Sequence, residues 1–379
     1  MKRCFSLCFL MMFASVLVMA ENGVTSKEIV IGVSNAQEGP SKSLGLQYSL
    51  GANAYFKSLN DAGGINGRKI KIIQYNDGYE PAQCILNTNK LIKEDKAFVL
   101  FGYVGTPTSM AVLPIVQKEK IPFFFPFSGA PGLRDVSKAS YVFNLRSSYE
   151  KETEMMVDYL VKKGKKKIAI FYQDDLYGKA GMDGTLKALN KREMKLVSEG
   201  SYVRNTIEIS NALASINKGA PEAIIMIGTY KPCSEFIKSA KIMGMNNVDF
   251  LNISFVGSTK LLTKLGKEGE GVIITEVVPF PWNKNIKAIA EYQDAMRKQN
   301  AEFEPEFISL EGYLGAKILA EMIEKTGKDL TRKKLIQTIE AVSNLDIGIG
   351  QDITFSKTDH EGFEKVYMTE IKDGKFIEK

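Results

Sequence analysis

The feature that most constrains the fold of this chain is a regular alternation of short apolar runs with amphipathic stretches. Residues 28–34 and 69–75 read as strands, and residues 45–60 between them carry apolar side chains near helical spacing. A strand at 97–101 and another at 121–125 continue the order, each next to a helical stretch. Strands that alternate with helices of this length favour a parallel sheet covered on both faces. The sequence therefore predicts an α/β fold.

The same rhythm starts again at residue 150, where a predicted helix at 150–163 leads into a strand at 167–171. Further helices are expected after a stiff Pro-rich connector at 279–282, and the tail reads as two strands, at 352–355 and 364–371. A length of 379 residues is comfortable for two domains. We predict two similar lobes with the late helices returning to the first: 27–146 plus 279–345 for the N-terminal lobe, and 147–278 plus 346–379 for the C-terminal lobe. A cleft between two hinged lobes is a ligand trap.

The N-terminus has the layout of a secretory signal peptide. Lys2 and Arg3 form a basic start, and an apolar stretch too short for a membrane span follows at 5–19. Small residues at the end of that stretch predict that residues 1–20 are removed by cleavage before Glu21. An uncleaved anchor remains an alternative, whereas lipidation at Cys8 is disfavoured because that residue precedes most of the apolar run.

Charge and cysteine usage exclude some classes of protein. The net charge of +6 falls to +4 when Lys2 and Arg3 leave with the signal peptide, which is no signature of a nucleic-acid-binding protein. The basic run at 162–167 is expected to be a solvated helix-to-strand turn. Cys84 and Cys233 are far apart in the sequence, so we expect both to be free and buried, with a bridge between them as the alternative.

The sequence lacks the patterns of common catalytic and metal sites. Its single histidine, His360, is expected in a surface turn, and one histidine without a nearby cysteine pair does not build a zinc site. There is no G-x-S-x-G motif and no G-K-[ST] motif. Asp174 and Asp175 are adjacent in an extended segment, so their side chains point in opposite directions. We therefore expect no enzymatic activity, no metal and no cofactor.

The stretch at 121–146 is the most informative for function. An apolar strand ends at Pro126, and a turn of small residues follows from Ser128 to Gly132. This turn offers backbone N–H groups and one hydroxyl at the end of a buried strand, which is where open α/β sheets hold ligands. The pattern favours a protein that grips a small molecule without reacting with it.

Several loose motifs occur in an order that resembles a known family. They are Asp-Ala-Gly-Gly-Ile-Asn-Gly at 61–67, Tyr-Gly at 177–178, Gly-Thr-Tyr at 228–230 and Glu-Gly-Tyr at 311–313. The chain resembles the type I periplasmic solute-binding proteins of ABC importers, in the leucine/isoleucine/valine-binding branch, over almost all of the mature sequence. The resemblance implies two Rossmann-like lobes with parallel-type sheets, joined by three hinge crossovers. It also implies a periplasmic location, a membrane permease as partner and, we expect, a monomer.

The resemblance places one end of the ligand site on the first lobe. In amino-acid-binding members, a hydroxyl at the start of a helix and the turn after the next strand hold the ligand carboxylate. The matching positions are Thr106, the backbone of Phe127, and Ser128 or Gly129. A helix N-terminus offers free N–H donors and the positive end of a dipole, which suit an anion. A helix cap is the alternative role of Thr106, and an exposed turn is that of Ser128.

The other end of the site is expected on the second lobe. Tyr177 and Tyr230 match positions of aromatic ligand contacts, with ordinary packing as the alternative, and Leu44 matches an apolar wall. Ser254 stands, within one residue, where amino-acid-binding members carry an acid for the ligand ammonium. Without that acid a buried ammonium lacks its counter-charge, which costs roughly 3–5 kcal/mol. An amino acid ligand is therefore disfavoured unless Glu38 or Asp175 substitutes.

These expectations define a function. We predict an extracytoplasmic protein that traps a small polar or carboxylate-bearing molecule between two lobes and delivers it to an ABC-type permease. An organic acid or amide is the first ligand class and an amino acid the second. A soluble ligand-sensing subunit that docks on a signalling partner is the alternative.

Overall fold

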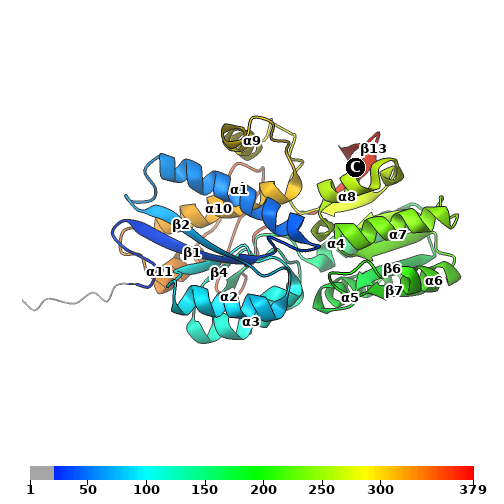
Figure 1. Ribbon diagram of the computed structural model, residues 1–379, viewed down its shortest axis with the longest axis horizontal. Coiled ribbons are helices and arrows are strands. Elements are labelled where there is room, and N and C mark those ends of the chain that lie inside the picture. Colours follow the sequence, from blue (N-terminus) through cyan, green and yellow to red (C-terminus); the bar gives the residue numbers. More distant parts are fainter. Residues whose placement is uncertain (1–20) are drawn as a thin grey trace, which may run out of the picture.

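The computed structural model describes residues 21–379, which form two lobes side by side, each built on its own sheet (Figure 1). The predicted signal peptide at 1–20 lies outside the described residues. In the first lobe the strand order is β2-β1-β3-β4-β5 and neighbouring strands are parallel. Its strands are β1 (Glu28–Asn35), β2 (Lys69–Asn76), β3 (Val99–Phe101), β4 (Phe123–Phe124) and β5 (Val142–Phe143). After Glu28 every residue of β1 is buried, as a parallel sheet covered on both faces requires.

Helices cover both faces of the first sheet. On one face α1 (Lys42–Asp61) packs along α10 (Phe307–Thr326), and α10 also contacts α9 (Lys287–Gln299) and α11 (Arg332–Ile339). On the other face α2 (Pro81–Lys93) packs against α3 (Thr106–Glu119) (Figure 1). The α1–α10 contact depends on glycine, because a Cβ on Gly312 would lie 2.0 Å from the Tyr48 carbonyl oxygen. The late helices thus pack on the first lobe.

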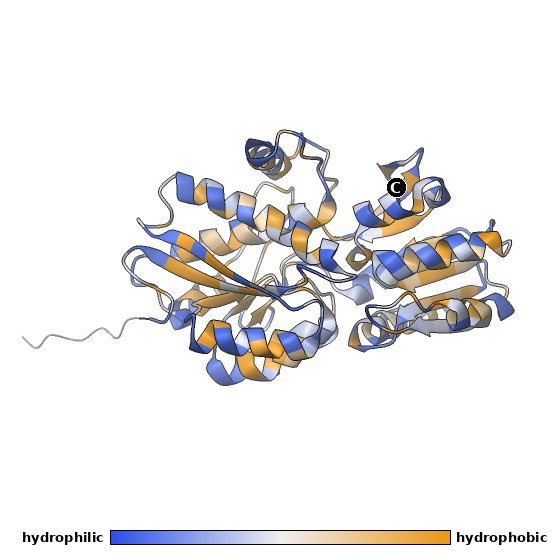
Figure 2. Cartoon of the chain, in the orientation of Figure 1, coloured by the Kyte–Doolittle hydropathy of each residue, from blue (hydrophilic) through white to orange (hydrophobic). Residues whose placement is uncertain are grey.

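The second lobe has the strand order β14-β13-β10-β9-β8-β6-β7. Strands β6 to β10 are parallel, and the tail adds an antiparallel hairpin at one edge. The strands are β6 (Ile168–Gln173), β7 (Ser198–Tyr202), β8 (Ala223–Ile227), β9 (Asp249–Asn252), β10 (Ile273–Glu276), β13 (Tyr367–Lys372) and β14 (Lys375–Glu378). The helices are α4 (Tyr149–Lys162), α5 (Leu176–Asn190), α6 (Ser210–Lys218), α7 (Tyr230–Ile242) and α8 (Ser258–Leu265). Figure 2 shows hydrophobic strands inside both lobes and helices with one hydrophobic and one hydrophilic side.

Within residues 21–379 the chain crosses between the lobes three times: after β5, after β10 and before β13. The last crossing lies further along the chain than predicted. The segment after β11 (Leu345–Asp346) and β12 (Asp352–Ile353) packs on the first sheet, where Phe355 lies 6.5 Å from Phe125 between ring centroids. The predicted lobe boundary between residues 345 and 346 is therefore wrong, and residues 346–363 lie with the first lobe.

His360 belongs to this returning segment and corrects a second expectation. Its side chain is 1% exposed, its ring stacks on Phe143 at 4.1 Å, and its Nδ1 lies 2.9 Å from the Val142 carbonyl oxygen. Burial lowers the pKa of His360 because a charged imidazolium is poorly solvated there. The predicted surface turn is wrong, since the apolar faces of the ring complete the packing against the sheet.

The expectations for the two cysteines and for the basic run are confirmed. Cys84 and Cys233 are free and buried. The basic run at 162–167 joins the end of α4 to β6, and most of its side chains are exposed. Separately, the described residues 21–379 contain no cluster of three or more His, Cys, Asp or Glu side chains placed to hold a metal ion. None of the helices in that part of the chain has the length and apolar character needed to cross a bilayer.

Candidate functional site

The predicted anion-binding residues of the first lobe come together at the carboxyl ends of β3 and β4. Thr106 begins α3 and Ser128 follows β4, and their hydroxyl oxygens lie 2.7 Å apart. Both side chains are buried. Gly105 caps α3 with a φ of 104°, a conformation that a glycine adopts without strain. The arrangement sets two hydroxyls beside the positive end of a helix of 14 residues.

Gly129 and Phe127 complete this turn in different ways. Gly129 leaves no room for a side chain, since a Cβ there would lie 2.4 Å from Cδ1 of Tyr149. The Phe127 N–H donates to the Tyr103 carbonyl, and its carbonyl accepts from the Gly105 N–H. Because both of its backbone groups have partners, Phe127 presents its ring to the second lobe, where it lies 5.2 Å from Phe255. The predicted contact of the Phe127 backbone with a ligand stays a prediction.

Tyr177 approaches the turn from the second lobe. It lies in the first turn of α5 and is fully buried, with its ring 4.5 Å from Phe255 and 5.5 Å from Tyr149. Its hydroxyl donates to the Gly228 carbonyl at 3.2 Å, so this group is engaged within its own lobe. Tyr177 therefore offers an aromatic wall.

Tyr230 contacts the first lobe directly. Its hydroxyl donates to the Pro40 carbonyl at 2.7 Å and accepts from the Ser43 N–H at 3.3 Å. Leu44 lies next to the same contact, because a Cβ on Gly257 would be 2.8 Å from Leu44 Cδ2 and 3.3 Å from Tyr230 Cδ1. These residues close one edge of the lobe interface.

Ser254 sits at the centre of a buried polar network. Its N–H and its hydroxyl donate to the two carboxylate oxygens of Glu152, at 2.8 and 3.0 Å. A guanidinium nitrogen of Arg146 donates to the same hydroxyl. The predicted substitutes for a ligand-pairing acid lie elsewhere: Glu38 is exposed, and Asp175 caps α5 and pairs with Arg204.

Arg146 is the positive charge of this network and faces buried carboxylates from both lobes. Its Nε lies 3.4 Å from Oε1 of Glu311, and its side chain is 1% exposed. Burial lowers the pKa of Arg146, but the attraction of Glu311 and Glu152 outweighs it, so the pKa is raised and the charge is kept. Burial raises the pKa of Glu311 to about 7, and Arg146 opposes that shift. Burial also raises the pKa of Glu276, because the charged carboxylate is poorly solvated there.

Some buried polar atoms here lack a hydrogen-bonding partner among residues 21–379. They include the Tyr149 hydroxyl, Nη1 of Arg146 and both side-chain polar atoms of Asn252. Buried polar groups in folded proteins are nearly always paired, so these atoms are candidates for contacts with a ligand or solvent.

Polar contacts between the lobes surround the site. Arg204 of the second lobe pairs with Glu80 of the first at 2.9 Å, and Asn205 donates to the same carboxylate at 2.7 Å. Gln173 donates to the Tyr79 hydroxyl at 3.1 Å. The structure is therefore a closed arrangement in which the two lobes touch.

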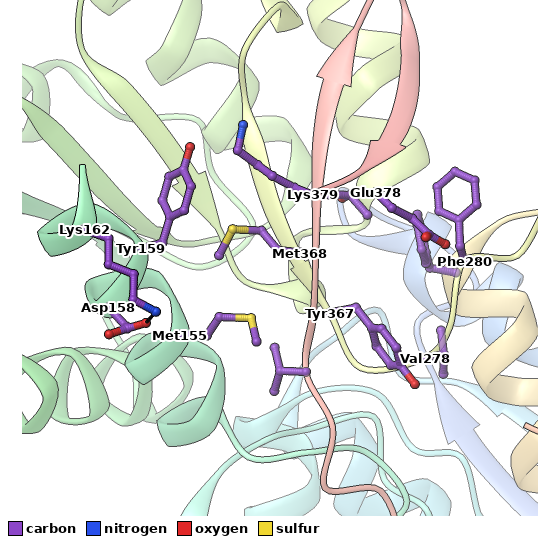
Figure 3. Close-up of a pocket in the computed structure, with 13 residues that line it drawn as sticks. Met155, Asp158, Tyr159, Lys162, Val278, Phe280, Tyr367, Met368, Glu378 and Lys379 are labelled. Carbon is purple, nitrogen blue, oxygen red and sulfur yellow. Dashed lines mark ion pairs between the residues drawn. The ribbon is translucent and has the colours of Figure 1, made fainter. Parts of the chain in front are cut away.

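A hollow of about 400 Å³ lies away from these residues, where α4, β13 and the connector after β10 meet (Figure 3). Met155, Tyr159 and Met368 line it, and Asp158 pairs with Lys162 at 2.7 Å near one end. No predicted site residue lines this hollow. The interlobe residues, which gather polar groups from both lobes, are the better candidate.

Sequence reasoning missed Arg146, Tyr149, Glu152 and Phe255. A signal for Arg146 was present, since this charged residue directly follows the mostly apolar run at 141–145. Glu152 and Phe255 carry no such local signal, because a first-turn glutamate and a phenylalanine near a strand end are common. Their role depends on contacts between segments more than one hundred residues apart.

Comparisons with known proteins agree with this architecture. The sequence model of the family described as "Periplasmic binding protein" matches residues 28–375. A solved structure of a possible leucine/isoleucine/valine-binding protein from Rhodopirellula baltica is 35% identical, with a TM-score of 0.89, over 93% of this chain and 96% of that one. A curated amino acid binding protein from Pseudomonas aeruginosa is 26% identical over 79% of each chain. A Leu/Ile/Val-binding protein homologue from Brucella melitensis is 23% identical over 92% of this chain and 93% of its own length.

Proposed function

Because the chain belongs to the periplasmic binding protein family, within its leucine/isoleucine/valine-binding branch, we propose that it traps a small carboxylate-bearing or other polar molecule between its lobes and delivers it to an ABC-type permease. We place it in the periplasm, after removal of residues 1–20, as a monomer. Binding is the role that the family's description names.

One observation carries the proposal. The hydroxyls of Thr106 and Ser128 meet at the N-terminus of α3, buried between two lobes that touch. The free N–H groups and the dipole of a helix N-terminus stabilise a negative charge. An anion held there would be covered by the aromatic wall of Tyr177 and by the contact of Tyr230 with the first lobe.

The other end of the site favours an organic acid or amide over an amino acid. Ser254 replaces the acid expected for an ammonium, and the nearby Glu152 carboxylate already accepts from Ser254 and Thr275. Similarity to the amino acid binding protein of Pseudomonas aeruginosa is the reason for an amino acid as the second ligand class.

Closure links binding to delivery. A ligand that contacts both lobes stabilises the closed form by its difference in affinity for the closed and open forms. Arg204 and Tyr230 contact the first lobe across the interface, so we expect opening of the lobes to break these contacts. We propose that the permease recognises the surface that this movement creates.

A thermal-shift screen tests the binding function. Organic acids, amides and amino acids are added to the mature protein, and a ligand above its Kd raises the melting temperature by mass action. We expect a carboxylate or amide to raise it in the wild type and to do so less in T106A. A screen in which none of these classes raises it would contradict the proposal.

Uptake measurements test the delivery. We expect deletion of the gene to abolish uptake of the labelled ligand that the screen identifies. Normal uptake together with loss of a cellular response to the same ligand would instead identify a sensing subunit.

A further inference from the structure

We propose that the Tyr149 hydroxyl is a third ligand-binding hydroxyl beside Thr106 and Ser128, and that the site selects an apolar carboxylate that has no α-ammonium group. This inference rests on the proposed function, because it concerns the same interlobe site. It adds a residue that neither the sequence motifs nor the family resemblance indicates, and it narrows the ligand class.

The position of Tyr149 is set by its backbone and its ring. The Tyr149 N–H donates to the Gly129 carbonyl at 2.9 Å, and the ring lies against the Cα of Gly129. Tyr149 starts α4 at the first crossover between the lobes. Its hydroxyl is close enough to Thr106 for that side chain to affect its pKa, yet the two groups lack the geometry of a hydrogen bond. Three hydroxyls are thus gathered in one buried corner.

The buried, unpartnered position of the Tyr149 hydroxyl argues against a purely structural role. The side chain is fully buried, and within the described chain the hydroxyl has no partner. A buried hydroxyl without a partner destabilises a protein, so packing alone would favour phenylalanine here. Burial raises the pKa of Tyr149, so the group stays protonated and can donate to a carboxylate oxygen.

The charges near this corner favour an anion over an ammonium group. Arg146 faces the network from the crossover, keeps its charge, and leaves Nη1 without a partner in the described residues. The carboxylate of Glu152 is occupied by Ser254 and Thr275. The pKa of Glu276 is raised, as is that of Glu311, because both are buried. An α-ammonium placed here would meet the Arg146 guanidinium, while the nearby carboxylates already pair with Arg146 (Glu311) or accept from Ser254 and Thr275 (Glu152).

Aromatic rings from both lobes surround Phe255 beside the hydroxyl corner. Phe255 lies between the lobes, with ring centroids 4.5 Å from Tyr177, 5.2 Å from Phe127, 6.1 Å from Tyr79 and 6.5 Å from Tyr149. Tyr79 and Phe127 belong to the first lobe, whereas Tyr149 and Tyr177 follow the first crossover. A ligand that reached from the hydroxyl corner toward Phe255 would contact these rings, which favours an apolar body.

Two pairs of probes that differ mainly in the ammonium group test the ligand class. They are 4-methylpentanoate against L-leucine, and 3-phenylpropanoate against L-phenylalanine. Isothermal titration with the mature wild type should show tighter binding of the carboxylate than of the amino acid in at least one pair. Tighter binding of the amino acid in both pairs, or binding of none of the four, would overturn the class. The thermal-shift screen, which tests the proposed binding function with more classes of ligand, would be interpreted independently of this result.

Y149F tests the residue, with Y177F as the matched control. Removal of an unpartnered hydroxyl should leave the melting temperature of the ligand-free protein unchanged or higher, while the Kd for the bound carboxylate rises about 10-fold or more. The Tyr177 hydroxyl already donates to Gly228, so Y177F should lower the ligand-free melting temperature and change the Kd less. An unchanged Kd in Y149F with normal wild-type binding would overturn the role of Tyr149 and leave the proposed function intact.

Discussion

The ring of Tyr79 packs on Gly105 so closely that a Cβ on this glycine would lie 2.1 Å from Cε2 of the tyrosine. This contact joins the segment between β2 and α2 to the N-terminus of α3. The contact also serves the lobe interface, because the Tyr79 hydroxyl accepts a hydrogen bond from Gln173 of the second lobe.

We expect G105A to lower the free energy of unfolding by about 2–4 kcal/mol, measured by chemical denaturation. The added methyl group would clash with Tyr79, and the φ of 104° is unfavourable for alanine. Gly67 also has a positive φ, of 80°, but open space around its Cα. G67A should therefore lose only about 1 kcal/mol. Equal losses in the two variants would show that the Tyr79 contact is unimportant.

S254A should destabilise the protein by about 1–3 kcal/mol in the same measurement. The Ser254 hydroxyl donates to Glu152 and accepts from Arg146, so its loss leaves two buried charged groups short of a partner. Ser234 provides a control, since its buried hydroxyl donates only to the Lys231 carbonyl of its own helix. If S234A proves as destabilising as S254A, the network around Arg146 contributes no more to stability than an ordinary buried serine hydroxyl.

R204A should shift the ligand-free protein toward an open form. Arg204 bridges Glu80 of the first lobe and Asp175 of the second, and a partly exposed bridge of this kind contributes up to about 1 kcal/mol. That energy changes the ratio of closed to open molecules roughly 5-fold. Small-angle scattering should show a larger radius of gyration than for K187A, whose lost pair with Glu150 lies within one lobe. Identical scattering from the two variants would contradict the closing role.

The buried carboxyl of Glu306 should make stability fall as the pH rises. Burial raises its pKa from 4.5 to about 7, so between these values the folded state binds more protons than the unfolded state. Its contribution is complete below about pH 4.5 and is lost as the pH approaches 7, with a magnitude of roughly 3 kcal/mol. In E306Q, which keeps an oxygen to accept from the Ser309 N–H, denaturation between pH 5 and 8 should show a smaller fall. The exposed Glu38 supplies the control. If E38Q changed the pH dependence of stability as much as E306Q, Glu306 would not be the origin of the fall.

Much of the fold could be predicted because it is encoded in local periodicity. The helix predicted at 45–60 is α1 (Lys42–Asp61), and the helix predicted at 150–163 is α4 (Tyr149–Lys162). Helix α8 (Ser258–Leu265) and strand β14 (Lys375–Glu378) were missed, since both are short and the hairpin partner of β14 stabilises it. Periodicity identifies an element only when it is long enough to repeat.

Within the candidate site, the sequence alone determined the groups that depend on strand ends. Thr106 and Ser128 follow neighbouring parallel strands, whose carboxyl ends meet at one edge of a sheet, so their approach to 2.7 Å follows from the local pattern. The role of Arg146 and the burial of His360 were decided by tertiary structure. Arg146 meets Ser254, 108 residues away, and His360 meets Val142, 218 residues away. Whether a polar side chain is solvated or buried depends on such distant segments, because the loss of water around a group is a property of the packed chain and not of its neighbours in sequence.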